Sequence, residues 1–595
     1  MAEEVLHAEN AHPALDPARP GGGSSAGGGA TDARRRLPFG RSAAMPADDP
    51  TPGEGGRGGR RGGGGHGHDE DAGGGGGIQG AFGTISEHDE GPRRSWRGKA
   101  LTLLAILGPG LIVMVGDNDA GGVATYAQAG QNYGLTLLWT LPLLIPVLVV
   151  NQEMVVRLGA VCGVGHARLI RERFGRFWGA FSVGDLFILN FLTIVTEFIG
   201  VSLALGYFGV SPDISVPLAG LGLVVMTASG SFRRWERFML LFVVANFLVI
   251  PLAIYAHPHA GPVFHHFFLP GVAGGFNSTA VLLIIAIVGT TVAPWQLFFQ
   301  QSNIVDKKIT PRWINYERMD TVLGSFVTVL AASLIMVTTA FAFAGTREFG
   351  RFSNAGGVAR ALDHSLGHAT GDLFAIVLLN ASIIGAAAVT LSTSYAFGDI
   401  FGLRHSLNRR VRDAKAFYAL FAGIVALAAT IVLLPGAPLG LITTAVQALA
   451  GILLPSATVF LLLLCNDKAV LGPWVNRPWL NCVATFIVSV LFVLSLILMT
   501  TTVFPHIDVP DLLGGLGAAM VVVLGVAGAL YLRMVHRRVA PVAEARARRE
   551  TWRMPPVALL ERPVWSRGRT LTMYLMYGYV FLAAVLLLVK AIQIG

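Results

Sequence analysis

Two carboxylates lie inside an apolar stretch that is long enough to cross a membrane. Asp117 and Asp119 flank the amide of Asn118 in GDNDAGG, residues 116–122, where glycines on both sides interrupt a helix. An ionisable side chain at the bilayer centre costs about 2.5–3.5 kcal/mol on insertion scales, so it usually marks a substrate or ion pathway. Carboxylates beside free backbone carbonyls are hard oxygen ligands, which suit a hard divalent cation.

A second interruption falls in IVGTTVAPWQLFFQQSN, residues 287–303, where Gly289 and Pro294 break another apolar run. Many secondary transporters consist of two inverted five-helix halves, each beginning with a broken helix, and bind substrate at the two breaks. Unwound backbone is tolerated in a bilayer only where protein or a water-filled cavity satisfies it. Glycine and proline also serve close packing and kinks in membrane helices. Two breaks at corresponding positions, one with two acids, favour an ion site.

The elements that position these residues are predicted to be membrane-spanning helices. Of the 595 residues, 53% are hydrophobic and 14% charged, with a mean hydropathy of +0.58, whereas soluble proteins carry about 25% charged residues. Runs long enough to cross about 30 Å of hydrocarbon recur along the chain. Thirteen spans are predicted, or twelve if the last, after a basic linker, is not one: 101–128, 134–157, 179–208, 213–230, 236–256, 279–303, 319–345, 372–401, 414–435, 439–465, 479–503, 512–534 and 571–592.

Basic loops set the predicted orientation. The formal net charge is +9, and Lys and Arg gather in alternate loops such as 157–179 and 402–415. This pattern follows the positive-inside rule and predicts a multi-pass protein of the plasma (inner) membrane with a cytoplasmic N-terminus. The basic charge therefore needs no nucleic-acid partner. Cys162, Cys465 and Cys482 lack metal-binding spacing and are interpreted as structural.

Composition divides the chain into four predicted segments. Residues 1–96 are Gly-rich and polar, and we expect a disordered cytoplasmic tail. Residues 97–256 and 257–468 are the two predicted inverted repeats, and residues 469–595 add further transmembrane helices with a basic linker. The tail holds a short polar cluster, interpreted as a solvated linker in preference to a weak divalent-ion site: His66, His68, Asp69, Glu70 and Asp71.

Several ordered motifs resemble those of one family. Span one carries GPG at 108–110 and DAGGVAT at 119–125, close to the pattern G-P-G…D-P-G-N…A-T. The loop RLGAVCGVGHARLIRERFGR, and Gln447 eight residues before Pro455, are also similar. From about residue 108 to 479 the chain therefore resembles the NRAMP family of divalent-metal transporters, most of all its magnesium-transporting branch. The resemblance implies an all-α polytopic membrane protein with a LeuT-like fold, two inverted five-helix repeats, broken helices 1 and 6, and extra C-terminal helices.

The departures from that family pattern fall on its metal ligands. Asp119 keeps the aspartate of D-P-G-N, but Gly122 replaces the asparagine. In span six, residues 290–295 are TTVAPW where the family pattern is A-T-V-M-P-H. Ala293 therefore occupies the position of the family's methionine. A soft thioether favours transition metals, whereas magnesium prefers oxygen ligands and keeps several waters. The wider, all-oxygen site therefore favours hydrated magnesium.

The residues that the resemblance links to proton coupling are also altered. Trp295 occupies the position of the family's span-six histidine. Of the family's acidic pair in span three, this chain retains Glu197 but has Ile194 in place of the other acid. The relay is predicted to be broken. A divalent ion gains about 4.6 kcal/mol per 100 mV of membrane potential, which drives uptake without protons.

Roles follow from the resemblance and from the chemistry. Asp119 is predicted to contact the ion directly or through water. Asp117 is predicted either to face the ion or to pair with a basic neighbour, and Gln447 either to offer its amide oxygen or to hold helices together. The predicted metal-site residues are Asp119, Asp117, Thr290, Gln447 and Gly122. Near Thr290 and Gly122 the predicted ligands are backbone carbonyls, which would complete the coordination shell. The predicted cavity-lining residues are Glu197, Ala293, Trp295 and Asn118, with simple packing as the alternative for Trp295.

The favoured function is a secondary transporter that moves hydrated magnesium, with manganese as a second ion, by alternating access without proton coupling. A proton-coupled manganese or iron transporter is one alternative, and a non-transporting membrane metal sensor or scaffold is another. An amino-acid carrier is disfavoured because two acids would repel a substrate carboxylate. The expected partners are the divalent ion and the lipid bilayer. Neither an enzyme activity nor a cofactor is predicted, because the sequence contains no P-loop or nucleophile elbow.

Overall fold

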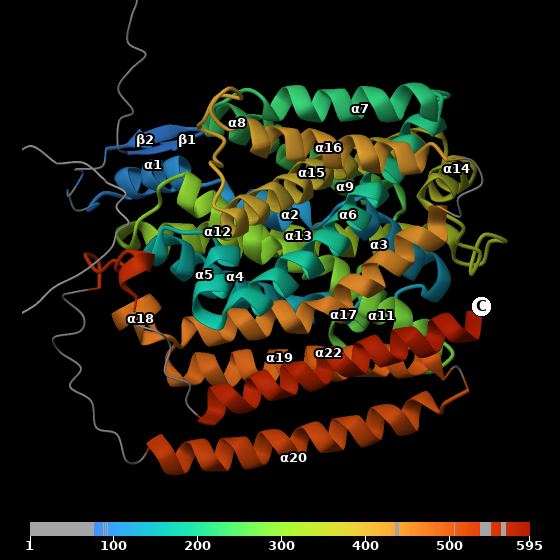
Figure 1. The fold of residues 1–595 in the computed structure, drawn as a ribbon. Helices are drawn as coiled ribbons and strands as arrows, with labels where there is room; N and C mark the ends of the chain where they lie inside the picture. The colour runs from blue at the N-terminus through green and yellow to red at the C-terminus, as the bar shows by residue number, and fades with distance from the viewer. Residues whose placement is uncertain are drawn as a thin grey trace, which may run out of the picture. The chain divides into compact units, whose positions relative to one another are not determined.

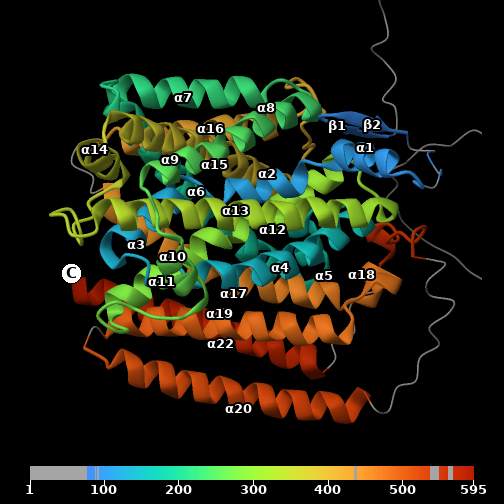
Figure 2. The same ribbon diagram turned by 180° about the vertical axis from the view of Figure 1, so that it is seen from behind.

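The computed structural model describes residues 77–86, 89, 91, 93–434, 439–504, 506–535, 549–560 and 567–594. These residues belong to one compact unit, from Gly74 to Gly595, in which long helices lie side by side (Figures 1 and 2). The elements of its first part are β1 (Ile78–Gly80), β2 (Gly83–Ile85), α1 (Trp96–Ile106), α2 (Pro109–Gly116), α3 (Ala120–Tyr133), α4 (Thr140–Cys162), α5 (His166–Phe174), α6 (Arg176–Tyr207), α7 (Pro212–Thr227), α8 (Phe232–Ala245), η1 (Asn246–Leu248), α9 (Val249–Tyr255) and α10 (Ala260–Phe268).

The remaining elements follow the second break and the C-terminal helices. They are α11 (Ser278–Thr291), α12 (Pro294–Asp306), η2 (Pro311–Trp313), α13 (Ile314–Phe343), α14 (Ala355–Leu366), α15 (His368–Phe401), α16 (Lys415–Val432), α17 (Leu439–Cys465), α18 (Lys468–Leu471), η3 (Gly472–Trp474), α19 (Pro478–Val503), α20 (Val509–Val535), η4 (Val557–Leu559) and α22 (Arg567–Ile594).

The predicted spans correspond to these helices. Within the described residues, ten helices or continuous helix pairs are long and apolar enough to cross a membrane, and the bent pair α1–α2 would add an eleventh. The difference from thirteen lies in α7, which is apolar but short at 16 residues, and in α22, which is not counted among the ten. Agreement in position is close, and α17 has the predicted bounds, 439–465.

The predicted span 101–128 is divided among three helices. Helices α1 and α2 meet at a bend of 53°, and residues 117–119 separate α2 from α3, which ends at Tyr133. Gly108 adopts a φ of +149°, which favours glycine, and Pro109 starts α2. The Asp320 carboxylate on α13 accepts hydrogen bonds from backbone amides at the start of α2, at 2.8–3.2 Å: Gly108, Gly110 and Leu111.

A β-hairpin stands where a disordered tail was predicted. Strands β1 and β2 pair antiparallel with Ile78 opposite Ile85, and both side chains are buried. Gly80 packs so closely on Ala105 of α1 that a Cβ would overlap the Ala105 carbonyl. The prediction for residues 1–96 is therefore wrong for residues 77–86 and for the start of α1. Two three-residue strands are stable only when packed on another element, and such packing is invisible in a Gly-rich sequence. The His66–Asp71 cluster lies outside the described residues.

Removing this hairpin is expected to destabilise the protein, whereas removing only residues 1–76 is not. The Ala81 amide donates a 2.6 Å hydrogen bond to the buried Glu236 carboxylate, and an orphaned buried acceptor costs about 1–3 kcal/mol. Thermal unfolding in detergent should place the midpoint of a chain lacking 1–86 clearly below that of a chain lacking 1–76. Equal midpoints would show that the hairpin contributes nothing to stability.

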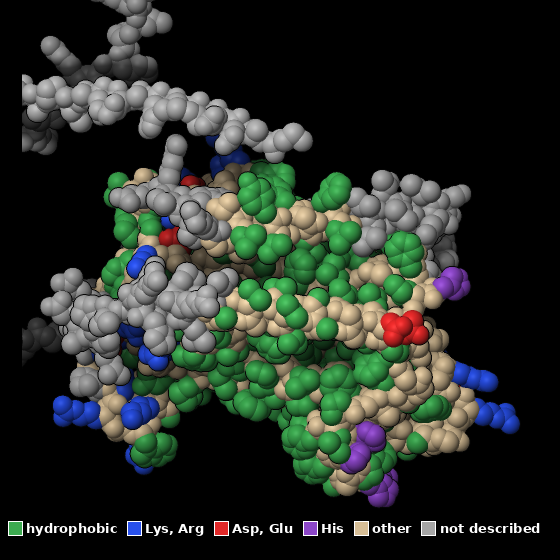
Figure 3. All heavy atoms as spheres, turned by 90° about the horizontal axis from the view of Figure 1, so that it is seen from below, with side chains coloured by type: hydrophobic (Ala, Val, Ile, Leu, Met, Phe, Trp, Pro, Cys, Tyr) green, Lys and Arg blue, Asp and Glu red, His purple; other side chains and the backbone are tan. Residues whose placement is uncertain are grey.

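Helix α20 lies on the outside of the bundle (Figures 1 and 2). Val521, Val522 and Val523 are 66%, 64% and 65% exposed, as expected for a surface that faces lipid tails. Figure 3 looks onto this side and shows a broad hydrophobic surface, with Lys and Arg concentrated toward the end where α5 and α18 lie. The three cysteines carry free thiols, buried at Cys162 and Cys465 and exposed at Cys482.

Candidate metal site at the two broken helices

The first break unwinds the chain at the two acids. Helix α2 ends at Gly116 and α3 begins at Ala120, so Asp117, Asn118 and Asp119 form the connection. Asp119 is the N-cap of α3, because its Oδ1 accepts a hydrogen bond from the Gly122 amide at 2.7 Å. Asp117 and Asp119 are 0% and 2% exposed. The predicted break in span one is therefore confirmed, and it holds both carboxylates inside the protein.

The second break lies directly beside the first. Helix α11 ends at Thr291 and α12 begins at Pro294, and the Thr291 hydroxyl lies 2.7 Å from the Tyr126 hydroxyl on α3. A Cβ on Gly122 would lie 2.8 Å from the Asp117 carbonyl oxygen and 3.1 Å from the Thr290 hydroxyl. The absence of a side chain at Gly122 thus lets the Asp117 carbonyl and the Thr290 hydroxyl approach the same point.

Helix α17 closes another side of this region with Gln447. A Cβ on Gly121 would overlap the Gln447 amide, and one on Gly289 would overlap the Gln447 carbonyl and the Gly451 amide. Glycines on both broken helices therefore admit α17 to close contact. The structure brings Gln447 to the first break, and its role in the ion site stays a prediction.

Helix α6 supplies a third acid next to Asp119. The Glu197 Oε2 atom accepts a hydrogen bond from the Ala120 amide at 3.1 Å, so Glu197 helps to cap α3. A Cβ on Gly385 of α15 would touch both the Glu197 carboxylate and Asp119 Cβ, at 2.6 and 2.8 Å. These contacts confirm that Glu197 lies beside Asp119 in the interior.

Several buried oxygens at the breaks make no well-formed hydrogen bond with a described residue, although Gln296 lies close to the Asp117 carboxylate and Thr290 lies close to the Asp119 carboxylate. These buried oxygens are both carboxylate oxygens of Asp117, the Thr290 hydroxyl, Glu197 Oε1 and Asn118 Oδ1. Burying a charge or a polar group without a partner is costly, so these atoms are suited to a bound cation or to water. The predicted ion pair between Asp117 and a basic neighbour does not occur in the described part of the chain.

The candidate metal ligands among the described residues are few and form no dense cluster. In the ranges that the structure describes, no three His, Cys, Asp or Glu side chains come together as a metal cluster. The available oxygens are the carboxylates of Asp117, Asp119 and Glu197, the Thr290 hydroxyl and backbone carbonyls, whereas Gln447 faces Gly121 with its Nε2 atom. Such a sparse set leaves coordination positions that water would fill, which is the pattern typical of magnesium.

Two predicted cavity-lining residues have clear packing roles. The Asn118 amide donates to the Thr328 carbonyl on α13 at 3.1 Å, which fixes the unwound segment. The Trp295 ring is 1% exposed and lies against Gly116, where a Cβ would meet the ring at 3.2 Å. Ala293 is buried as the residue before Pro294. For Trp295 the structure agrees with the packing alternative.

The sequence analysis did not identify two glutamines that form hydrogen bonds at the unwound backbone of the second break. Gln296 donates to the Thr291 carbonyl at 3.2 Å, and Gln152 of α4 donates to the Gln296 side-chain oxygen at 2.9 Å. An amide side chain can satisfy unwound backbone without adding charge. The available signal was the polar run after Pro294, which is unusual within a membrane span.

Asp185 was also missed as a residue near the pathway. It lies in a narrow cleft of about 10 Å³ beside Pro294 and accepts a 3.0 Å hydrogen bond from Ser456. A similar cleft of about 10 Å³ borders Ala120 and the other half of α6, at Thr196. One cleft therefore borders the second break at Pro294, and the other borders the first break at Ala120.

A buried ion pair links the ends of the two broken spans. Lys307, directly after α12, lies 2.6 Å from the Glu236 carboxylate of α8, and both side chains are 0% exposed. The Lys307 ammonium also donates to the carbonyls of Ile106 and Leu107, at 2.6 and 3.1 Å, in the bend before α2. This pair therefore ties the end of span six to the start of span one.

A bundle of membrane-spanning helices with two unwound spans around buried acids defines a multi-span transporter. Residues 110–501 match the family described as natural resistance-associated macrophage protein-like, or Nramp. The chain belongs to the Nramp family. Members of this family are metal transporters and not enzymes.

Named relatives agree with this assignment. The divalent metal cation transporter MntH of Aeromonas hydrophila is 25% identical over 423 residues, which cover 67% of this chain and 96% of the relative. MntH of Levilactobacillus brevis is 26% identical over 426 residues, covering 68% and 90%. A crystal structure of the Eremococcus coleocola manganese transporter aligns with a TM-score of 0.57 and 21% identity over 74% of this chain and 98% of that one.

These findings confirm the predicted fold class, an all-α polytopic membrane protein with a LeuT-like fold, broken helices 1 and 6, and additional C-terminal helices. They also make the chain a transporter of divalent metal cations.

Proposed function

We propose that the transported ion is magnesium, carried with part of its hydration shell, and that manganese is a second substrate. The observation that carries this proposal is the set of buried, unpartnered oxygens at the breaks, above all the Asp117 carboxylate and the Thr290 hydroxyl. Apart from Gln447, whose Nε2 atom faces Gly121, every candidate ligand is an oxygen. Hard oxygen ligands and retained waters suit magnesium, which dehydrates reluctantly.

Manganese as the main substrate is the strongest alternative, because the relatives include a protein named a manganese transporter. The argument against it is the residue at position 293. Ala293 lies at the second break, where the resembling family carries a methionine, and a thioether favours softer metals. The chain therefore lacks the ligand that would select manganese over magnesium.

We further propose that transport is not coupled to protons. Trp295 cannot titrate, and the buried Ile194 stands one helical turn before Glu197. Because the membrane potential alone contributes about 4.6 kcal/mol per 100 mV for a divalent ion, coupling is not required. A cytoplasmic N-terminus in the plasma membrane, with the basic loops on the same side, belongs to this proposal.

Flux measurements in sealed vesicles test both parts of the proposal. Purified protein is reconstituted with an internal dye for magnesium or manganese and a second dye for pH, and uptake is driven by a negative internal potential. We expect magnesium uptake with no internal acidification. Acidification in step with metal entry would support the proton-coupled alternative, and absence of any ion flux would support a sensor or scaffold.

Replacing Ala293 by methionine is expected to shift selectivity toward manganese. The change restores a soft thioether at the second break, and one added metal–ligand contact worth about 1.4 kcal/mol corresponds to a tenfold change. The ratio of manganese to magnesium uptake should therefore rise about tenfold. Ala293→Leu is the control for volume, because leucine has a similar size but no sulfur. An equal ratio in both variants would contradict the soft-ligand explanation.

A further inference from the structure

A second polar region, which shares no lining residue with the broken helices, borders a cavity at one end of α4 and α13. This cavity has a volume of about 300 Å³ and lies between α4, α13, the start of α19 and residue 549. Four arginines line it against a single acid, Glu153. We call it the arginine pocket, and its arginines are Arg157, Arg318, Arg477 and Arg549.

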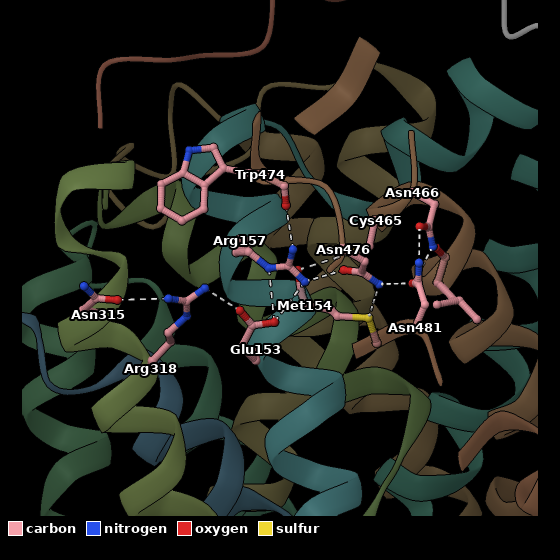
Figure 4. Close-up of polar contacts among 11 residues, drawn as sticks. Glu153, Met154, Arg157, Asn315, Arg318, Cys465, Asn466, Trp474, Asn476 and Asn481 are labelled. Carbon is pink, nitrogen blue, oxygen red and sulfur yellow. Dashed lines mark hydrogen bonds and ion pairs between the residues drawn. The ribbon is translucent and has the colours of Figure 1, made fainter. Parts of the chain in front are cut away.

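Two of the arginines are held in place by neighbouring groups, as Figure 4 shows. Arg157 donates to the Trp474 carbonyl at 2.6 Å and to the Asn476 side chain at 2.5 Å, and it pairs with Glu153 at 2.9 Å. Arg318 pairs with the same carboxylate at 2.5 Å. Glu153 is therefore shared between two guanidinium groups.

The remaining positive charge faces the cavity. The exposed Arg477 side chain makes no hydrogen bond or ion pair with any described residue, and it lines the pocket. The buried Arg318 Nε also lacks a partner within the described part of the chain. Trp474 lies under two guanidinium groups, with Arg318 and Arg549 at 6.0 and 5.5 Å from its ring. The pocket thus presents the Arg477 guanidinium beside two fixed arginines, and a guanidinium group matches the geometry of a phosphate group.

Several of the other lining residues are apolar. Val149 and Val150 of α4 and Leu480 of α19 form part of the wall, and Trp479 is 59% exposed at the start of that helix. Tryptophan at the end of a membrane span is typical of the lipid headgroup level. A ligand with an anionic head and a hydrocarbon tail would contact both parts of this lining.

We propose that the arginine pocket binds the phosphate headgroup of an anionic phospholipid, with an acyl chain along the wall formed by α4 and α19. The source is a membrane lipid and not a free phosphate, because the pocket adjoins the surface of apolar spans. The bound lipid bridges α4, α13 and α19, so it joins helices on both sides of the Glu153–Arg318 ion pair. This site does not depend on which metal is transported.

Lipid retention by the full-length protein tests this proposal. Protein in nanodiscs of phosphatidylcholine with phosphatidylglycerol is released into mild detergent, and retained lipids are counted by native mass spectrometry. We expect retained phosphatidylglycerol in the wild type and about fivefold less in Arg477→Gln, since one basic residue contributes about 1 kcal/mol to binding of anionic lipid. Arg168→Gln, an exposed arginine on α5 outside the pocket, should retain wild-type amounts.

A thermal unfolding series separates the lipid from other anions and from misfolding. In phosphatidylcholine alone the wild type and Arg477→Gln should unfold at the same temperature, and phosphatidylglycerol should raise the midpoint of the wild type only. The same Arg477-dependent rise with inorganic phosphate would overturn the lipid assignment. Equal phosphatidylglycerol retention in wild type and Arg477→Gln, or an equal loss in Arg168→Gln, would overturn the site. Because neither readout measures metal flux, failure here leaves the proposed transport function untouched.

Discussion

Replacing Asp119 by asparagine is expected to lower divalent-metal flux about a hundredfold, which corresponds to about 2.8 kcal/mol. The substitution removes a buried charge at the junction of both breaks, where little water screens its attraction for a cation. Asparagine is as good an N-cap as aspartate, so the hydrogen bond from the Gly122 amide to residue 119 can be kept. The initial rate of magnesium and manganese uptake into proteoliposomes is the measurement.

Two further variants interpret that result. Asp119→Ala should lose the cap as well, which costs about 1 kcal/mol of stability, so it should be both inactive and less stable. Asp213→Asn removes an exposed acid in the first turn of α7 and should keep wild-type flux. Wild-type flux in a correctly folded Asp119→Asn variant would remove Asp119 from the ion site.

Replacing Lys307 by methionine is expected to lower the free energy of unfolding by about 3–5 kcal/mol, the usual cost of breaking a buried ion pair. The change leaves the Glu236 carboxylate buried without its partner at 2.6 Å. It also removes the donor to two carbonyls at the bend before α2. Thermal or denaturant unfolding of the purified protein measures the effect.

The double variant Glu236→Gln with Lys307→Met gives the decisive comparison. Glutamine removes the stranded charge and can still accept the Ala81 amide hydrogen bond, so the double variant should be more stable than Lys307→Met alone. Lys308→Met changes the exposed neighbour and should leave stability unchanged. Additive losses in the double variant would show that the charge pair is not what stabilises this end of the spans.

Much of the helical framework was predictable because membrane spans leave a strong local signal. Long apolar runs, and glycines or proline at GDNDAGG and TTVAPW, determine where helices form and where they break, since these effects act within a few residues. The hairpin at 78–85 and the bend at Gly108 were not predictable, because each is stabilised by residues far along the chain. Ala105 packs on the hairpin and Asp320 caps α2.

The candidate site, too, was predictable from the sequence only in part. Asp117, Asp119 and Thr290 stand out in the sequence because polar groups in apolar runs are costly, and their role in ion binding stays a prediction. Tertiary structure alone decided that Trp295 packs on Gly116, that Asn118 is tied to α13, and that Asp117 keeps unpartnered oxygens. The arginine pocket likewise joins residues more than 300 positions apart, such as Arg157 and Arg477.

By itself, then, the sequence determined an all-α membrane transporter with two broken spans and buried acids, because length, hydropathy and helix breakers are local properties. Only the tertiary structure decided which of those polar groups find partners, because a hydrogen bond or an ion pair depends on the separation of atoms in space. At the breaks, the tertiary structure brings the Asp117 carbonyl and the Thr290 hydroxyl to Gly122, and it buries the Asp117 carboxylate close to Gln296.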